Sequence, residues 1–133
     1  SLLYDDDAGG GVRDSVRLVV RAPAELDDLW RRATAGQSAP PPAPAVDFAR
    51  EMVVAVAAGR RAPDDRIRVD SVGLRREPGA DGRVREVLAV LVRTTEECGR
   101  YATPVYPLQV VRVRRYDGPV MFVERRERGE RCT

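Results

Sequence analysis

The sequence predicts an α+β domain that is mainly β, with about six mostly antiparallel strands and one helix at residues 23–33. Short valine-rich runs alternate with turn-forming residues, which is typical of strands. The links between the later runs are too short for crossover helices, which favours antiparallel neighbours. We therefore expect a sheet folded into a sandwich or partial barrel, with the helix against one face or edge.

The first third of the chain contains the helix. Residues 1–14 include three consecutive glycines and are predicted to be a flexible N-terminal lead, because glycine loses the most backbone freedom on ordering. A strand is predicted from Ser15 to Arg21. The helix follows from Pro23 to Ala33, since proline suits the first helical turn. Leu26 and Trp30 lie on its apolar stripe and are predicted core anchors.

A proline-rich stretch separates the helix from the most apolar run of the chain. Residues 36–45 are predicted to cross the surface as an extended loop. Phe48 follows and is a predicted core anchor. Met52 to Ala58 is almost continuously apolar, which indicates a central strand covered on both faces, with Val54 and Val56 as core anchors. Residues 15–133 are accordingly expected to form a single domain.

Two long runs joined by a turn predict a hairpin. Arg66 to Glu77 alternates between apolar and charged residues, but the alternation slips by one place near its middle, which indicates a β-bulge. Pro78 to Gly82 has turn composition. Arg83 to Thr95 is the predicted return strand.

The last third of the chain predicts a long loop and two further strands. The loop runs to Pro107, and the strands are predicted from Leu108 to Arg115 and from Val120 to Glu124. Phe122, on the last strand, is a predicted core anchor. Basic and aromatic side chains in this region form a predicted partner surface, namely Arg112, Arg114, Arg115, Tyr101 and Tyr106.

Composition excludes several classes of function. The 23 basic residues are balanced by 21 acids, which argues against a nucleic-acid-binding protein. The chain has no histidine, so a serine–histidine–acid triad is impossible. Asp64, Asp65, Glu96 and Glu97 are predicted to be surface acids and not a catalytic pair. No cofactor or metal site is predicted, and no apolar run approaches the ~20 residues of a membrane helix.

Cys98 and Cys132 are the only cysteines. They could be free thiols, metal ligands or a disulfide pair. A metal site requires more ligands than two cysteines supply in a chain without histidine. Pairing explains why a cysteine lies near the end of a charged tail, because a covalent bond would hold a segment that buries little. A disulfide indicates an oxidising compartment.

The order of these segments resembles the C-terminal domain of the protease complex subunit PrcB family. The similar region spans residues 46–124, and its most specific pieces are Asp47–Phe48, the apolar strand ending at Gly59, and the strand after Pro107. The family often has a Gly-Gly-Tyr-like entry to the following strand, whereas this chain has Ala62 to Arg66 there. The resemblance implies a secreted, periplasmic or lipid-anchored bacterial domain that associates with a subtilisin-like protease and carries no catalytic residue.

The sequence thus predicts a non-enzymatic extracytoplasmic binding or stabilising module, an accessory subunit of a secreted or surface protease complex. If it works by strand addition, an exposed sheet edge would take up a partner segment. One alternative is a protease inhibitor that presents the loop at 99–107. A third reading, a carboxylate-based hydrolase, would require two acids to converge in a cleft. The oligomeric state is not predicted.

Overall fold

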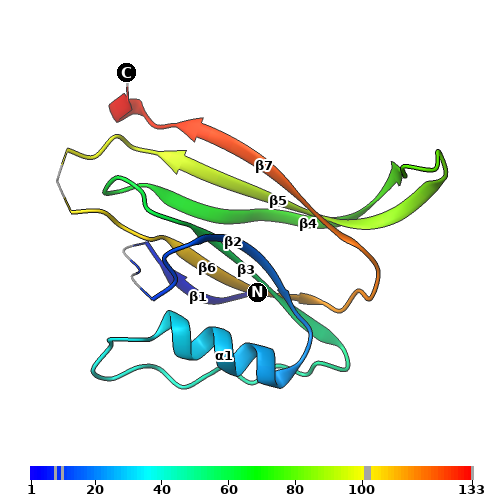
Figure 1. The fold of residues 1–133 in the computed structure, drawn as a ribbon, viewed down its shortest axis with the longest axis horizontal. Helices are drawn as coiled ribbons and strands as arrows, with labels where there is room; N and C mark the ends of the chain where they lie inside the picture. Colours follow the sequence, from blue (N-terminus) through cyan, green and yellow to red (C-terminus); the bar gives the residue numbers. More distant parts are fainter. Residues whose placement is uncertain (8, 10, 101–102, 133) are drawn as a thin grey trace.

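A computed structural model describes residues 1–133 except residues 8, 10, 101, 102 and 133. The described chain forms two sheets and one α-helix, stacked as three layers (Figure 1). The elements in chain order are β1 (Leu2–Asp6), β2 (Ser15–Val20), α1 (Pro23–Ala33), β3 (Glu51–Ala58), β4 (Arg66–Pro78), β5 (Val84–Glu96), β6 (Leu108–Arg114), β7 (Val120–Arg128) and the 3-10 helix η1 (Glu130–Cys132).

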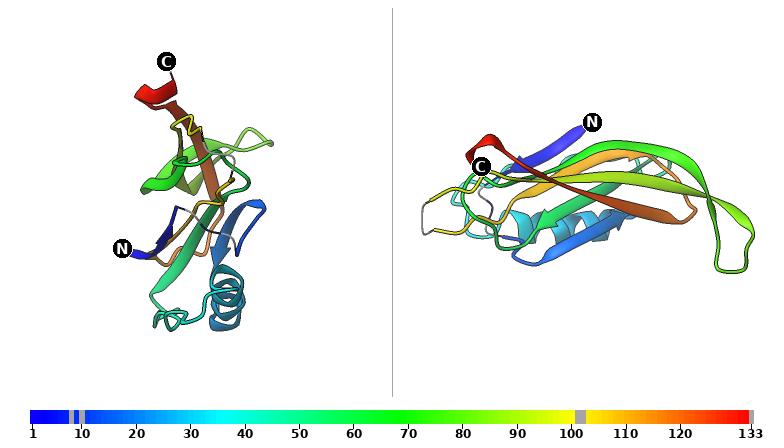
Figure 2. Two further views of the ribbon diagram at one scale, coloured as in Figure 1. Left: turned by 90° about the vertical axis from the view of Figure 1, so that its left-hand side faces the viewer. Right: turned by 90° about the horizontal axis from the view of Figure 1, so that it is seen from above.

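The predicted fold class is confirmed: the domain is mainly β, and most strand pairs are antiparallel. The first sheet has the order β1-β6-β3-β2, and the second has the order β4-β5-β7. Only β5 and β7 pair in parallel among the described strands. The first sheet lies between α1 and the second sheet (Figures 1 and 2).

The strand count is higher than predicted because part of the expected flexible lead forms β1. Residues Leu2 to Asp6 pair with β6 at the edge of the first sheet. The Tyr4 ring packs edge-on against Trp30, with ring centroids 5.2 Å apart. Val12 also lies in the core and is only 2% exposed. The three glycines therefore do not prevent the residues on either side from packing.

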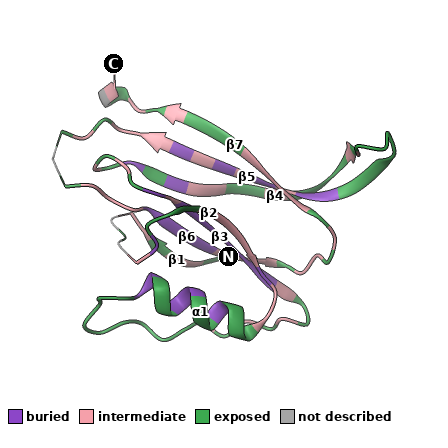
Figure 3. Cartoon of the chain, viewed as in Figure 1, coloured by how far each residue is buried: buried purple, intermediate pink, exposed green. Residues whose placement is uncertain are grey.

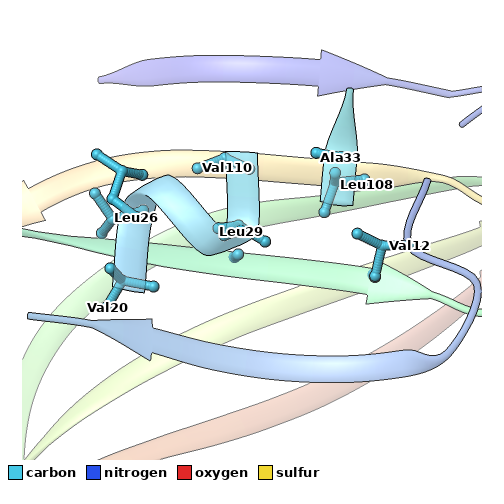
Figure 4. Packing of buried hydrophobic residues seen from close by; sticks show 10 residues of the cluster. Val12, Val20, Leu26, Leu29, Ala33, Leu108 and Val110 are labelled. Atoms are coloured by element: carbon cyan, nitrogen blue, oxygen red, sulfur yellow. The ribbon is translucent and has the colours of Figure 1, made fainter. Parts of the chain in front are cut away.

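α1 begins at Pro23, as predicted, and packs its apolar stripe on the first sheet. Leu26, Leu29 and Ala33 meet Val20, Leu108 and Val110 in this lower core (Figure 4). Trp30 is buried beside them, and its indole N–H donates to the Pro41 carbonyl over 2.9 Å. This hydrogen bond fastens the proline-rich loop to the helix.

β3 is the central strand, and both of its faces are buried as predicted. Val53, Ala55 and Ala57 face α1 in the lower core. Val54 and Val56 face the second sheet in an upper core with Ile67, Val90 and Val92. Two predicted core anchors, Phe48 and Phe122, are half-buried and pack against the margins of these cores. Figure 3 shows the buried residues concentrated between the layers.

The predicted hairpin is formed by β4 and β5, and its predicted bulge is confirmed by a register shift between Val69 and Ser71. At this point the Val69 N–H donates to the buried side chain of Gln109 on β6 over 2.7 Å. Because Gln109 belongs to the other sheet, this hydrogen bond joins the two sheets across the upper core.

β7 extends beyond the predicted end at Glu124 and reaches Arg128. Its charged second half continues the parallel ladder with β5, so that Arg128 lies opposite Glu96. Backbone pairing therefore orders a segment whose side chains bury little. No helix among the described residues has the length and apolar character required to cross a bilayer.

Candidate binding groove beneath the hairpin arm

The distal part of the β4–β5 hairpin, residues 73–88, projects beyond the rest of the molecule; we call it the hairpin arm (Figures 1 and 2). Side chains on a strand alternate between its two faces. The face that forms the upper core at Val72 therefore continues along the arm through Leu74. The first sheet does not extend beneath it. Leu74 is 58% exposed and Val84 is 64% exposed, so the arm presents apolar side chains to solvent.

A groove with a volume of about 580 Å³ lies beneath the base of the arm. One wall comes from β4 and β5, and the other comes from the end of β6 and the residues that follow it. The residues that line the groove are Val72, Gly73, Leu74, Leu88, Val113, Arg114, Arg115 and Tyr116. The groove is therefore mainly apolar, with two arginines and one tyrosine as its polar groups.

Tyr116 connects the two walls of the groove. Its hydroxyl donates to the backbone carbonyl of Glu86 on the arm over 3.1 Å. Burial raises the pKa of the Tyr116 phenol, and the nearby Glu86 carboxylate raises it further. The phenol is consequently a neutral hydrogen-bond donor at physiological pH.

The two arginines of the groove have different roles. The Arg115 guanidinium donates to the carbonyls of Arg21 and Phe48 at 3.0 and 2.8 Å and pairs with Asp117 at 2.8 Å. Arg115 is thus a structural residue that fastens loops together. Arg114 is exposed, and no ion pair involving it is found among the described residues. It is the groove cation that is available to an acidic group of a partner.

The predicted partner surface is only partly brought together. Arg114 and Arg115 line the groove, but Arg112 pairs with Glu51 at 3.3 Å on the first sheet. Tyr106 lies beneath the Arg13 guanidinium, 5.2 Å from the ring centroid. Tyr101 lies outside the described residues.

Sequence reasoning missed the apolar part of the groove. Leu74 and Leu88 were visible as apolar strand residues, and the uncovered position of Leu74 follows from strand length. β4 and β5 each have 13 residues, whereas β3 beneath them has eight. A hairpin longer than the sheet it covers must leave part of its inner face open, and this length difference could have identified the groove.

A second candidate surface lies at the opposite end of the molecule, where three segments converge. The predicted disulfide joins Cys98 to Cys132, with Cα atoms 5.1 Å apart. Gly99 packs against the backbone of Pro63 so closely that a Cβ atom would collide with the Pro63 carbonyl oxygen. The β5–β6 loop, the β3–β4 loop and η1 are thereby held together.

The returning half of the β5–β6 loop is held by a backbone bridge. Arg61 and Val105 exchange hydrogen bonds of 2.9 and 3.0 Å. Two non-glycine residues at this end, Asp64 and Cys98, have positive φ values of 72° and 54°. Such left-handed backbone is strained for residues with a side chain and persists only where neighbouring contacts impose it.

Of the four predicted surface acids at this end, Asp64 is exposed as predicted, Glu96 and Glu97 are half-buried, and Asp65 departs from the prediction. Asp65 is buried and not a surface acid. One carboxylate oxygen of Asp65 accepts the Glu97 N–H at 2.9 Å, and the other accepts the Arg61 Nε–H at 3.1 Å. Arg61 also pairs with Glu96 at 3.3 Å. These contacts make the acids a brace between two loops.

Among the described residues, no group of three or more acidic or cysteine side chains is arranged to hold a metal ion. Comparisons with protein-family models, with curated proteins and with solved structures found no match to this chain.

Proposed function

We propose that this protein is a non-enzymatic extracytoplasmic binding module that holds a partner protein in the groove beneath its hairpin arm. The observation that carries the proposal is the uncovered apolar face of the arm, where Leu74 and Val84 are more than half exposed. Exposed apolar side chains grouped around a groove are typical of protein-interaction sites. The Cys98–Cys132 disulfide supports an oxidising compartment outside the cytoplasm.

The resemblance to the PrcB family supplies the class of partner. It favours a subtilisin-like protease of the envelope or cell surface, with this chain as an accessory subunit that stabilises it. Arg114 would meet an acidic side chain of the partner at the rim of the groove, while apolar side chains fill its floor.

Site-specific photocrosslinking tests the binding surface. A photoreactive phenylalanine analogue placed at Leu74 should form an adduct with one discrete protein of the native envelope or secreted fraction. The matched control places the same group at Leu2, which is 57% exposed on β1. Equal labelling at both positions, or labelling at neither, would contradict a binding role for the arm.

The protease partner is tested separately with a purified secreted subtilisin-like protease. Its autolytic lifetime should increase in the presence of the protein while its hydrolysis of a small peptide substrate is retained. Leu74→Asp should abolish the gain in lifetime, and Leu2→Asp should not. An unchanged lifetime would remove the protease as the partner, while the crosslinking result would still decide whether the arm binds a protein.

A second candidate function is protease inhibition by the loop at 99–107. The observation that favours it is the bracing of the loop base by the disulfide, by Gly99 against Pro63 and by the Arg61–Val105 bridge. A loop held in this way loses little conformational entropy on binding. Inhibition at micromolar concentration that disappears on reduction would support this function. Full protease activity at that concentration would remove it.

A further inference from the structure

β2 is the edge strand of the first sheet. The register with β3 determines which of its backbone N–H and C=O groups bond β3 and which face solvent. In an antiparallel sheet, the backbone groups of successive residues point to opposite neighbours. The Ala58 N–H donates to the Pro107 carbonyl on the β6 side over 3.0 Å. Ala57 and Ala55 therefore turn their backbone groups towards β2.

The register then assigns the outward-facing residues of β2. Ala57 lies opposite Val16, and Ala55 lies opposite Leu18. Val16 and Leu18 thus use their backbone groups to bond β3. Arg17 and Val19 lie between these bonded positions, so their N–H and C=O groups point away from the sheet, on the side where none of the described strands pairs with β2. Two residues present four hydrogen-bonding groups at the correct spacing for an added strand.

The other sheet edges are less suited to strand addition. β4 has a bulge at its middle, and Arg75, Arg76 and Pro78 follow on its outer half. Charged residues, proline and bulges are the features by which natural edge strands avoid pairing. β7 has five consecutive charged residues from Glu124 to Arg128, and β1 has a register irregularity after Leu2.

A groove with a volume of about 400 Å³ runs between β2 and α1. Its lining residues are Leu18, Val19, Val20, Ala24, Glu25, Asp28, Leu29 and Arg32. The apolar members come from the strand and from the helix face beside it. Glu25 and Asp28 lie on the helix at the rim, and within the described part of the chain Asp28 is engaged by an exposed pair with Arg31 at 3.4 Å. An exposed pair of this kind contributes little and is easily replaced.

We propose that the β2 edge takes up an extended segment of a partner protein as a fifth strand of the first sheet. The segment bonds to the backbone of Arg17 and Val19. Its side chains on the α1 side enter the groove, where an apolar residue contacts Leu18 and a basic residue reaches Glu25 and Asp28. This inference goes beyond the proposed function and does not rest on it, because it uses a different groove and a different kind of contact.

Amide hydrogen exchange provides a direct test. In the free protein, Arg17 and Val19 should exchange rapidly, and Val16, Leu18 and Val20 should be protected. The probe is an acetylated eight-residue peptide with threonine at every second position and valine and lysine by turns at the positions between, so that one face of the strand carries both valine and lysine. It is added at millimolar concentration. It should slow exchange at Arg17 and Val19 at least tenfold. The same peptide with glutamate in place of each lysine should have a much smaller effect.

Charge-reversal variants connect the exchange result to the groove. Glu25→Arg should reduce the affinity for the valine–lysine peptide at least fivefold. The matched control is Asp27→Arg, which makes the same charge change on the same helix at the side near Trp30. Protected core amides, Val54 among them, would report whether each variant is folded.

Four results would overturn the proposal. Slow exchange at Arg17 and Val19 in the free protein would show that the edge is already occupied. Equal effects of the two peptides, or of the two variants, would remove the role of the acidic rim. Protection of Arg17 and Val19 that rises with protein concentration alone would assign the edge to a second copy of the chain.

Discussion

At the scale of single residues, two buried polar side chains join segments that lie far apart in the sequence. Gln109 accepts the N–H of Val69, 40 residues away. Asp65 accepts the N–H of Glu97, 32 residues away. Neither role could be predicted from sequence, because each depends on the register between strands and loops that meet only in the folded chain. The sequence shows which residues are polar but not which backbone group each one satisfies.

The Gln109 contact leads to a stability prediction. Gln109→Leu should destabilise the protein by about 1–3 kcal/mol, because the Val69 N–H loses its acceptor inside the structure. Urea denaturation measures this change. The control is Gln37→Leu, an exposed residue whose amide donates to the Tyr4 hydroxyl at 2.9 Å. Its effect should stay within about 0.5 kcal/mol. Equal losses in both variants would show that the inter-sheet hydrogen bond contributes nothing specific.

At the scale of elements, local pattern was sufficient where an element is defined by its own residues. The α1 stripe, the apolar β3 and the bulged hairpin were all predictable for this reason. β1 was not, because the strand it pairs with is β6, near the other end of the chain. The parallel pairing of β5 and β7 was also missed. It arises because the chain leaves the second sheet to form β6 and then returns, which the sequence pattern does not reveal.

The candidate groove could not be predicted for the same reason, because it depends on which segments meet in the folded chain. Both strands of the hairpin were predicted with nearly correct lengths, yet their apolar residues gave no sign of where the first sheet ends.

If the distal arm contributes to binding and not to the core, its removal should leave the fold intact. Replacing residues 76–86 by an Asn-Gly turn would join Arg75 to Val87, which already lie opposite each other.

The shortened variant should keep the far-ultraviolet circular dichroism of the parent and lose no more than about 1 kcal/mol of stability, since most of the removed residues are exposed and none is buried. Photocrosslinking from Leu74 should decrease, because the exposed Val84 is lost while Leu74 and the other groove-lining residues remain. Cooperative unfolding lost together with the arm would show instead that the distal hairpin supports the upper core.

At the scale of the whole molecule, covalent and ionic contacts hold the layers at their margins. Arg17 on β2 pairs with Glu124 on β7 at 2.8 Å, and Arg68 on β4 reaches Asp5 and Asp7 beside β1 at 3.1 and 2.9 Å. One arginine thus forms ion pairs along each open side of the two packed sheets, with one acid on the Arg17 side and two on the Arg68 side. Burial raises the pKa of the Asp5 carboxyl, although Arg68 acts in the opposite direction. The charge of Asp5 therefore contributes less to stability than its short distance to Arg68 implies.

The disulfide closes the remaining margin, at the end where η1 meets the β5–β6 loop. Cys98 and Cys132 are 34 residues apart, and closing a loop of this length restricts the unfolded chain by roughly 3–4 kcal/mol. The Cys98→Ser/Cys132→Ser double variant should lose about that much stability. Because the effect is exerted mainly on the unfolded state, the slope of the urea transition should increase as the unfolded chain expands.

Arg17→Gln, which removes an ion pair at the other margin, should cost at most about 1 kcal/mol and leave the slope unchanged. If the double variant unfolded at the same urea concentration as the parent, the terminal segment would be held by its β7 pairing alone, and the disulfide would have no part in stabilising the fold.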